Sequence, residues 1–597
     1  MKMRYPLGSF IVTLNCLLAG ALHAEVKMPA IFSDHMVLQQ EAKLPVWGWA
    51  DPGEKVAVTF GSAKAEATSG PDGKWRVDLP PVPAGTPPGT LVVAGKNTIT
   101  ISDVLVGEVW LCSGQSNMEY HLGSPGVRPT DTQHVNDSQL RLFHSANFYG
   151  DDPRDVVPAD DVKGSWQVCS YESPYARDFL WKFSGVGYYF GKNLRTALNR
   201  PVGLIESAQG GTSAQAWTSL SALASNPVLS HYADVFKAWA ATAPGNNVDF
   251  FAKLNGEIAA YQKWAVAVDA DPTYKAAMKA WIASAPQVRA SGQRPPPQPV
   301  PPIPAPVQTL HYLPAGTFMF NSELNPLIPF AIKGVIWYQG EGNAEGPASA
   351  FEYRTLLPAL ITDWRTRWGQ GDFPFLIVQL ANFGESPKDP VESSNWAILR
   401  ESQLKTLALP NTGLAVTIDI GNSQEVHYSD KADVGARLAL AARHIAYGEK
   451  IVYTGPIYDS FTTEGDKIRI TFKSPSVGGG LVIGSSPWLD PRATPVSKTK
   501  LEGFGIAGED KNWVSADATI DGNSVVVSSP KVAKPISVRY GWAGGPACNL
   551  YNKENLPASP FRTDDWPVVP ANLPARVAPA RVTTPVSTRP TPDAPRR

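Results

Sequence analysis

The segment formed by residues 106–118 constrains the fold of this chain more than any other segment. An apolar run, residues 106–111, is followed directly by a cysteine and then Ser-Gly-Gln-Ser-Asn. This pattern predicts a buried strand that delivers Ser116 to a tight polar turn, because Gly114 lets the chain turn sharply beside it. A serine at the carboxyl end of a central strand is well placed to be a nucleophile. The same serine could instead cap the helix that follows, since Ser and Asn both cap well.

The composition fits a globular protein of several domains and limits its partners. The chain has 597 residues, of which 43% are apolar and 18% charged, and its net charge is −1. This balance gives no electrostatic case for binding nucleic acid or an anionic membrane. Residues 1–24 are typical of a secretory signal peptide, with Lys2 and Arg4 before an apolar stretch and Ala24 at the cleavage site. No second long apolar run exists, so we expect a soluble protein that is periplasmic or secreted.

Two regions of short alternating runs predict β modules on either side of a larger domain. Residues 25–105 predict a small antiparallel β-sandwich, with turns at Asp-Pro-Gly (51–53) and Pro-Asp-Gly (71–73). Residues 451–566 alternate in the same way, for example at 466–472, and predict a second β domain. Residues 567–597 are rich in Pro, Arg and Thr with few apolar anchors, which predicts a disordered tail.

Residues 106–450, between these modules, predict an α/β domain. Helical patterns at residues 188–198 and 353–368 lie between apolar strand-like runs at residues 106–111, 202–205, 334–338, 375–379 and 414–418. This alternation is typical of a parallel sheet with crossover helices. An insertion at about residues 219–309 interrupts the domain. It combines apolar residues at helical spacing, which predict a helical hairpin, with a proline-rich run at residues 294–307, which predicts a polyproline-II strap.

A serine nucleophile needs hydrogen-bond donors that stabilise the oxyanion of the reaction, and two further strand ends offer such donors. Gly210 and Gly211 follow the strand at 202–205, and paired glycines let a backbone N–H approach a substrate oxygen. Gln339 and Asn343 follow the strand at 334–338 and carry side-chain amides. Glu341, between them, could be a surface carboxylate or the structural partner of an arginine. Each segment alone could also be an ordinary strand-to-helix turn.

His427 is the candidate base. It is one of nine histidines, and it follows the last predicted strand of the α/β region and precedes a helix that begins near Lys431. A single loop histidine is more often a surface residue than a catalyst. A base at this point, however, can reach the carboxyl edge of the sheet, where Ser116 should lie. Because such a base must be neutral to accept a proton, we expect activity to fall below about pH 6.5.

The strings Gly-Gln-Ser-Asn-Met (114–118) and Trp-Tyr-Gln-Gly-Glu (337–341), in this order, resemble the SGNH hydrolase superfamily. The closer resemblance is to the sialate O-acetylesterase-like proteins and related bacterial carbohydrate acetylesterases. It extends to residues 31–39, 396–403, 540–542 and 548–552, and so covers roughly residues 28–566 without the proline-rich insertion.

This resemblance implies a flavodoxin-like three-layer αβα domain flanked by β modules, and removal of O-linked acetyl groups from sugars without a metal or cofactor. Ser116 would be the nucleophile and His427 the general base. The N–H groups of Ser116 and Gly211 and an amide from Gln339 or Asn343 would form the oxyanion hole. The expected partner is an acetylated oligo- or polysaccharide.

Three positions depart from the family pattern. Many SGNH enzymes carry Asp three residues before the catalytic histidine, where this chain has Gln424. Glu425 is the nearest acid and resembles the Asp of the Asp-Ile-His-Pro string of close relatives, with Asp419 or no acid at all as the alternatives. Tyr428 replaces the proline that often follows the histidine. The stretch at residues 320–324 also differs from the family's usual Asn-Gly-Met-Ile, and it could border the site and affect substrate choice.

The substrate is left open among several classes. Within the carbohydrate esterases, an acetylated plant polysaccharide such as xylan or xyloglucan suits the β modules, and we favour it. An O-acetylated sialic acid would need an arginine near the site to hold its carboxylate, and the sequence places none. Outside that class, the alternatives are a non-catalytic carbohydrate-binding protein on the same fold and a lipase-type esterase.

Overall fold

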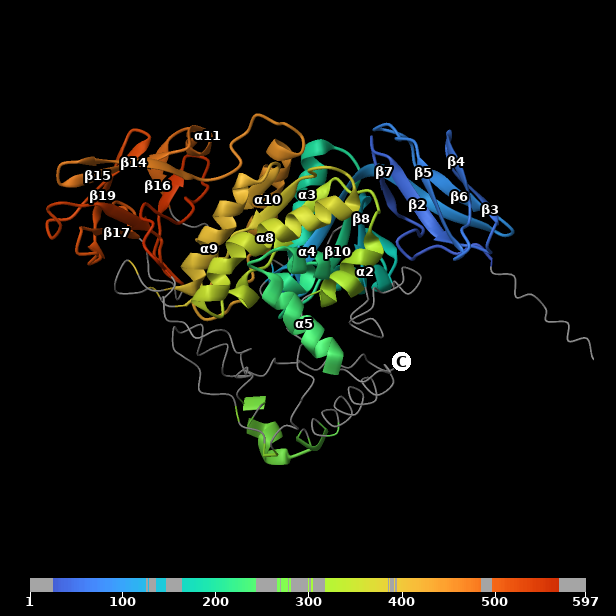
Figure 1. The fold of residues 1–597 in the computed structure, drawn as a ribbon, viewed down its shortest axis with the longest axis horizontal. Coiled ribbons are helices and arrows are strands. Elements are labelled where there is room, and N and C mark those ends of the chain that lie inside the picture. The colour runs from blue at the N-terminus through green and yellow to red at the C-terminus, as the bar shows by residue number, and fades with distance from the viewer. Residues whose placement is uncertain are drawn as a thin grey trace, which may run out of the picture.

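The computed structural model describes residues 25–124, 136–145, 164–242, 317–384, 394–484 and 497–568, with isolated positions between these ranges. The expected leader at residues 1–24 lies outside the described residues. So do most of the insertion after residue 242 and all but the first two residues of the expected tail. Figure 1 shows a central α/β body with β-strands at both ends.

The central sheet is mostly parallel, which confirms the expected mixed α/β class. Every neighbouring pair along it is parallel except β8 and β9. Strands such as β11 are buried along their whole length, as expected where helices cover both faces. The order is β13 (Thr412–Ala415), β12 (Phe375–Val378), β11 (Gly334–Tyr338), β7 (Thr98–Gly114), β10 (Val202–Ala208), β8 (Asn136–His144) and β9 (Trp166–Ser170).

Helices lie on both faces of this sheet (Figure 1). Helices α3 (Gly185–Leu198) and α10 (Lys431–Ile445) pack together on one face, and α8 (Pro347–Trp368) and α9 (Asn395–Lys405) on the other. Aromatic contacts mark the two layers: Trp110 of β7 meets Phe190 of α3 at 5.1 Å between ring centroids, and Trp337 of β11 meets Trp364 of α8 at 5.6 Å.

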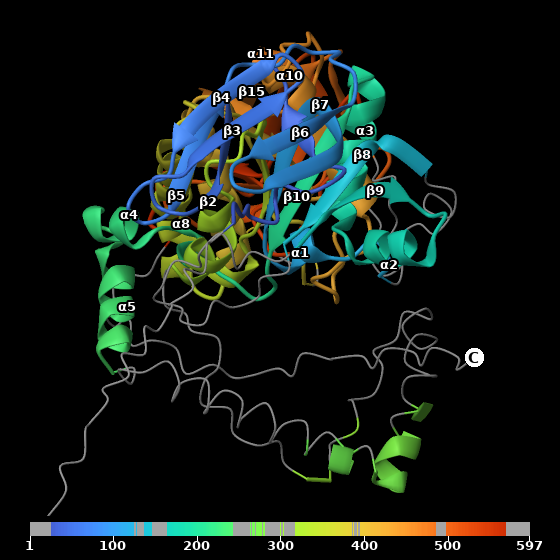
Figure 2. The ribbon, with the colours of Figure 1, turned by 90° about the vertical axis from the view of Figure 1, so that its right-hand side faces the viewer.

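The shorter helices join these layers or begin the insertion. Within the insertion the structure describes α4, which packs against α8, and α5, which leads away from the body (Figure 2). Those with bounds in the described ranges are α1 (Ser116–Glu119), α2 (Pro174–Lys182), η3 (Ala214–Trp217), α4 (Leu220–Ser225), α5 (Ser230–Thr242), η4 (Phe320–Leu324), η5 (Asn325–Leu327), η6 (Glu341–Asn343), η7 (Thr406–Ala408) and α11 (Ser474–Val477).

One long strand joins the N-terminal β region to the central sheet. Strand β7 has 17 residues; its first part pairs antiparallel with β6, and its second part pairs parallel with β10 and β11. The boundary expected between residues 105 and 106 therefore falls inside a continuous strand. The other N-terminal strands are β1 (Val37–Gln39), β2 (Leu44–Trp49), β3 (Lys55–Phe60), β4 (Ala63–Thr68), β5 (Lys74–Leu79) and β6 (Gly89–Ala94).

The C-terminal region forms further antiparallel sheets at the opposite end of the molecule (Figure 1). One has the order β14-β15-β20-β19, a second β18-β17-β21-β23, and β16 pairs with β22. The strands are β14 (Tyr458–Glu464), β15 (Lys467–Phe472), β16 (Leu481–Ile483), β17 (Phe504–Ala507), β18 (Val514–Ser515), β19 (Asp517–Asp521), β20 (Ser524–Ser528), β21 (Ser537–Tyr540), β22 (Leu550–Asn552) and β23 (Phe561–Arg562).

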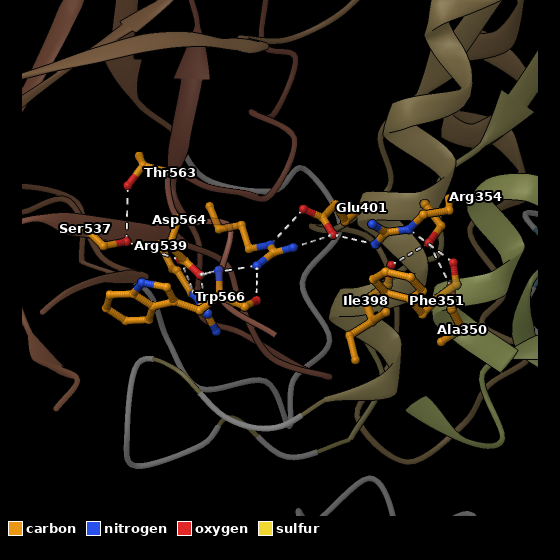
Figure 3. A network of polar contacts seen from close by, with 12 residues as sticks. Ala350, Phe351, Arg354, Ile398, Glu401, Ser537, Arg539, Thr563, Asp564 and Trp566 are labelled. Carbon is orange, nitrogen blue, oxygen red and sulfur yellow. Dashed lines mark hydrogen bonds and ion pairs between the residues drawn. The ribbon is translucent and has the colours of Figure 1, made fainter. Parts of the chain in front are cut away.

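A network of ion pairs connects these C-terminal strands to the α/β body (Figure 3). Arg354 of α8 and Arg562 of β23 both donate to the Glu401 carboxylate of α9, at 2.9 and 2.8 Å. Arg562 also donates a hydrogen bond to the Asp564 carboxylate, at 3.2 Å. Arg539 of β21 donates two more to the same carboxylate, at 2.7 and 2.8 Å. Since Arg539, Arg562 and Asp564 are largely buried, the network positions the C-terminal strands against α8 and α9.

Candidate active site

Ser116 lies where β7 ends, at the carboxyl edge of the central sheet. Gly114 closes the strand with a φ of +144°, and a Cβ there would lie 2.1 Å from the Tyr338 carbonyl oxygen, so glycine is required. The Gln115 N–H donates to that same oxygen at 2.9 Å, and α1 follows. Gln115 is the N-cap residue of α1 and Ser116 its first helical residue. Ser116 is therefore not the helix cap that the alternative interpretation required.

His427 reaches Ser116 from the loop between β13 and α10. Its Nε2 lies 2.8 Å from Ser116 Oγ. The Tyr120 ring stacks on the imidazole, with ring centroids 6.2 Å apart and planes 19° apart. The His427 side chain is 39% exposed, so a substrate and water can both approach it. When Nε2 carries no proton, this geometry lets the imidazole accept the serine proton.

The two acids considered beside His427 have different surroundings. Glu425 Oε1 lies 3.5 Å from His427 Nδ1 and accepts the His427 backbone N–H at 3.0 Å, with the Glu425 side chain 53% exposed. Asp419 is buried instead. It accepts two hydrogen bonds from Arg437, at 2.6 and 2.8 Å, and one from the Tyr551 hydroxyl at 3.0 Å. Glu425 is thus the acid beside the imidazole, whereas Asp419 serves a buried ion pair.

The first of the paired glycines, Gly210, lies directly against Ser116. A Cβ placed on Gly210 would lie 3.3 Å from the Ser116 Cβ. The Gly210 N–H donates to Glu119 Oε2 at 2.6 Å, which ties this turn to the end of α1. Gly211 adopts a φ of +74°, with open space where a side chain would stand. The turn therefore leaves room for a substrate oxygen beside Gly211.

Gln339 and Asn343 reach the same edge, but their amides are engaged with protein groups. Gln339 Nε2 donates to Asn343 Oδ1 at 2.8 Å and to Gln115 Oε1 at 3.1 Å, while the Tyr353 hydroxyl donates to Gln339 Oε1 at 2.8 Å. Asn343 Nδ2 donates to Gln215 Oε1 at 3.0 Å. Both side chains are buried. This network connects the turn after β11 to the Ser116 turn and to η3.

Glu341 has neither of the two surroundings expected for it, because its Oε2 is shielded from solvent and no arginine of the described residues bonds to it. Its Oε1 accepts from Asn117 Nδ2 at 2.5 Å, and burial raises the pKa of its carboxyl. Sequence reasoning missed Asn117 and Glu119, although both stand within three residues of Ser116. It also missed the buried side chain of Lys431, since a lysine at a helix start ordinarily indicates an exposed position.

The stretch that departs from the family pattern forms the π-helical turn η4. Its Glu323 is buried, and Glu323 Oε2 accepts from the Ser145 hydroxyl at 3.1 Å. The Ser207 hydroxyl of β10 donates to the Glu323 carbonyl oxygen at 3.2 Å. Burial raises the pKa of the Glu323 carboxyl to about 8. The turn is therefore anchored to β10, a short distance along the chain before the paired glycines.

The described residues contain neither a cluster of metal ligands nor a membrane-spanning helix. Among them, no group of three or more His, Cys, Asp or Glu side chains is arranged to hold a metal ion. Within the same part of the chain, no helix combines the length and apolar character needed to cross a membrane.

The family model described as "Carbohydrate esterase, sialic acid-specific acetylesterase" matches residues 106–284 and 319–444, which is more than half of the chain. The chain belongs to this carbohydrate esterase family. Its members are acetylesterases, so the chain is a carboxylic ester hydrolase, as the sequence resemblance implied. The matched residues begin in β7 and include Ser116, the paired glycines and His427.

Similar proteins extend the family match over most of the chain. The solved structure of a novel carbohydrate acetylesterase from Xanthomonas citri is 34% identical, with a TM-score of 0.68, and the match covers 91% of this chain and 100% of that one. The sialate O-acetylesterase of Mus musculus is 28% identical over 460 residues, or 72% of this chain and 75% of the mouse protein. The sialate O-acetylesterase of Homo sapiens is 24% identical, covering 90% of this chain and 92% of its own.

Proposed function

We propose that this family member is a secreted serine esterase that removes O-acetyl groups from carbohydrate through an acetyl-Ser116 intermediate. The observation that carries the proposal is the 2.8 Å contact between Ser116 Oγ and His427 Nε2 at the carboxyl edge of a parallel sheet. The helices on both faces of that sheet support a flavodoxin-like SGNH domain. Residues 1–24 support export, because they have the pattern of a signal peptide.

The proposed reaction has two halves. In the first, His427 accepts the Ser116 hydroxyl proton while Ser116 Oγ attacks the acetyl carbonyl carbon. His427 then gives that proton to the sugar oxygen as the ester bond breaks, which releases the sugar and leaves acetyl-Ser116. In the second half His427 deprotonates water, the hydroxide attacks the acetyl carbon, and acetate leaves as Ser116 regains its proton.

The oxyanion of each tetrahedral intermediate is proposed to bind the N–H groups of Ser116 and Gly211. The first amide of a helix has no partner within that helix, so the Ser116 N–H is available at the N-terminus of α1. The open, left-handed Gly211 leaves space for an oxygen beside its N–H. Gln339 and Asn343 were candidate donors as well, but their amides already bond to protein groups. We therefore assign these two the role of holding the surrounding turns.

Glu425 is the proposed partner of His427. Its carboxylate can stabilise the imidazolium that forms during each half of the reaction. The stabilisation should be small, because both side chains are substantially exposed to water. The reaction should therefore depend mainly on Ser116, His427 and the oxyanion donors, with Glu425 in an auxiliary role.

We propose an acetylated plant cell-wall polysaccharide, such as xyloglucan or xylan, as the substrate. The exposed Glu425 carboxylate beside His427 disfavours a second negative charge at the site, which supports an uncharged sugar over sialic acid. The family description and the mouse and human relatives support the alternative, an O-acetylated sialic acid.

A substrate panel tests both the activity and the sugar. Acetate loss from acetylated xyloglucan, xylan, mannan and O-acetylated sialic acid is followed by mass spectrometry, with Ser116→Ala as the inactive control. Release from xyloglucan or xylan supports the plant polysaccharide, and release from sialic acid alone replaces it with the sialate reaction. A wild-type protein that releases no acetate, even from 4-nitrophenyl acetate, would be a carbohydrate-binding protein instead. Rates that rise with acyl chain length would indicate a lipase-type esterase.

A further inference from the structure

Lys431 is a buried lysine directly behind the site. It is the first residue of α10, four positions after His427, and it has no exposed surface. Its Nζ lies 4.1 Å from the ring centroid of Tyr428, 4.7 Å from that of Tyr120 and 5.7 Å from that of Tyr338. A lysine is almost never fully buried unless its ammonium is paired, so this position needs a physical reason.

The hydrogen-bond partner of Lys431 is the residue that follows the nucleophile. Lys431 Nζ donates to Asn117 Oδ1 at 2.6 Å. Asn117 Nδ2 donates to Glu341 Oε1 at 2.5 Å and to the Val426 carbonyl oxygen at 3.1 Å. Only one orientation of the amide satisfies these contacts, because a flip would turn its NH₂ toward the ammonium and its oxygen toward the carboxylate.

The Asn117 amide therefore joins the two halves of the proposed machinery. Asn117 is next to Ser116 in the chain, and Val426 is next to His427. A fixed amide between them fixes the distance from the serine backbone to the histidine backbone. That distance matters for the reaction, because a misplacement of about 1 Å can cost on the order of a hundredfold in rate.

Acidic groups from three places act on the ammonium. Burial, the largest effect, lowers the pKa of Lys431, while Glu341 of η6, Asp430 at the N-cap of α10 and Glu425 in the histidine loop raise it. The net result is a pKa of about 7. Glu341 is half-buried, with its Oε2 shielded from solvent, and it is linked to Lys431 through Asn117. The Lys431 amine, which can donate with or without its extra proton, and the Glu341 carboxyl group thus hold the amide from its two ends.

We propose that Lys431 is a positioning residue, whose amino group locks the Asn117 amide and so holds the His427 loop at the correct distance from Ser116. The proposal rests on the proposed function, in which Ser116 and His427 carry the reaction. Lys431 touches neither the substrate nor the reacting atoms. Its effect should appear in kcat, while binding of the substrate should be unchanged.

The main test replaces the ammonium and keeps the apolar stem. We expect Lys431→Met to lower kcat for 4-nitrophenyl acetate by roughly ten- to hundredfold, the scale of a lost hydrogen bond to a charged group, with KM within about twofold of wild type. The rate of Ser116 labelling by a fluorophosphonate should fall in parallel. The matched control is Lys405→Met, which removes an exposed lysine at the end of α9 and should leave both constants unchanged.

A double variant separates positioning from a general loss of stability. If Lys431 and Glu341 act on one amide, the loss in kcat for Lys431→Met with Glu341→Gln should be clearly smaller than the product of the single losses. Independent structural roles would instead give multiplicative losses and overturn the proposal. If Lys431→Met does not fold, Asn117→Ala is the deciding variant, because it removes the bridging amide and keeps the Lys431 and Glu341 side chains. A kcat within threefold of wild type in either folded variant overturns the proposal.

The outcomes also separate this proposal from the proposed function. A wild-type protein without esterase activity would refute the proposed function itself. An active wild type, with Lys431→Met equally active, would refute only the positioning role.

Discussion

Glu425→Gln should lower kcat/KM only slightly, which is a direct consequence of where the structure places this acid. Glu425 Oε1 lies 3.5 Å from His427 Nδ1, and the two side chains are 53% and 39% exposed. Ion pairs that are open to water contribute about 0.2–1 kcal/mol. Converted to a rate, that range is a loss of about fivefold at most.

This small loss contrasts with the behaviour of a buried triad acid, whose replacement by its amide lowers kcat by about 10⁴ in the serine proteases. Asp419, the other acid considered, is buried, but its carboxylate holds Arg437 and Tyr551. Asp419→Asn leaves the Arg437 guanidinium uncompensated, and breaking a buried pair costs about 3–5 kcal/mol of stability. That variant should therefore lose thermal stability, and its folded fraction should keep its kcat.

The assay measures kcat and KM with 4-nitrophenyl acetate at pH 8, with thermal unfolding in parallel. Glu509→Gln, at an exposed carboxylate of the C-terminal region, is the matched control and should change neither quantity. A loss of a thousandfold or more in Glu425→Gln, at unchanged Tm, would refute the reasoning. It would mean that Glu425 acts as a full triad acid shielded from water during turnover.

Three further predictions concern the surroundings of Ser116. Gly210→Ala should lower kcat by about a hundredfold, because the added Cβ would lie 2.9 Å from Glu119 Oε2 and 3.3 Å from the Ser116 Cβ. Kinetics with 4-nitrophenyl acetate measure the loss, and a kcat equal to that of the wild type would contradict this prediction. Glu119→Ala should lower kcat at least about tenfold, whereas the kcat of Glu119→Gln should stay within about threefold of wild type. Of the two variants, only the glutamine keeps a side-chain oxygen that can accept the Gly210 N–H. Equal kcat values for the two variants would show that this hydrogen bond does not matter. Burial raises the pKa of Glu323 to about 8, so the folded state keeps a proton that the unfolded state releases above about pH 4.5, and stability falls as pH rises toward 8. Glu323→Gln should therefore raise Tm more at pH 8 than at pH 5, and an equal change at both pH values in thermal unfolding would contradict this assignment.

The parallel sheet was predictable from the sequence because its strands are continuous apolar runs separated by helical patterns. Residues 202–205 and 334–338 are buried on both faces, which is what such runs indicate. The proximity of Ser116 and His427 followed from the same pattern, since parallel strands end at one edge of a sheet. The two side chains lie 2.8 Å apart at that edge.

Features that depend on tertiary contacts could not be predicted in this way. A local pattern indicates where a strand ends, but not that β7 continues from one sheet into another. The choice between Glu425 and Asp419 depends on the position of Arg437, 18 residues further along the chain from Asp419. Likewise, the amides of Gln339 and Asn343 have the correct chemistry for an oxyanion, yet neighbours distant in sequence already engage them.

Trapping the acyl-enzyme tests the central claim most directly. Wild-type protein and Ser116→Ala are mixed with 4-nitrophenyl acetate, quenched in acid within the first turnovers, and digested for peptide mass spectrometry. We predict one added acetyl group on the peptide that contains Ser116 in the wild type, and none at that position in the variant. An active wild type without this adduct, or an adduct on another residue that persists with full activity in Ser116→Ala, would contradict the assignment of Ser116 as the nucleophile.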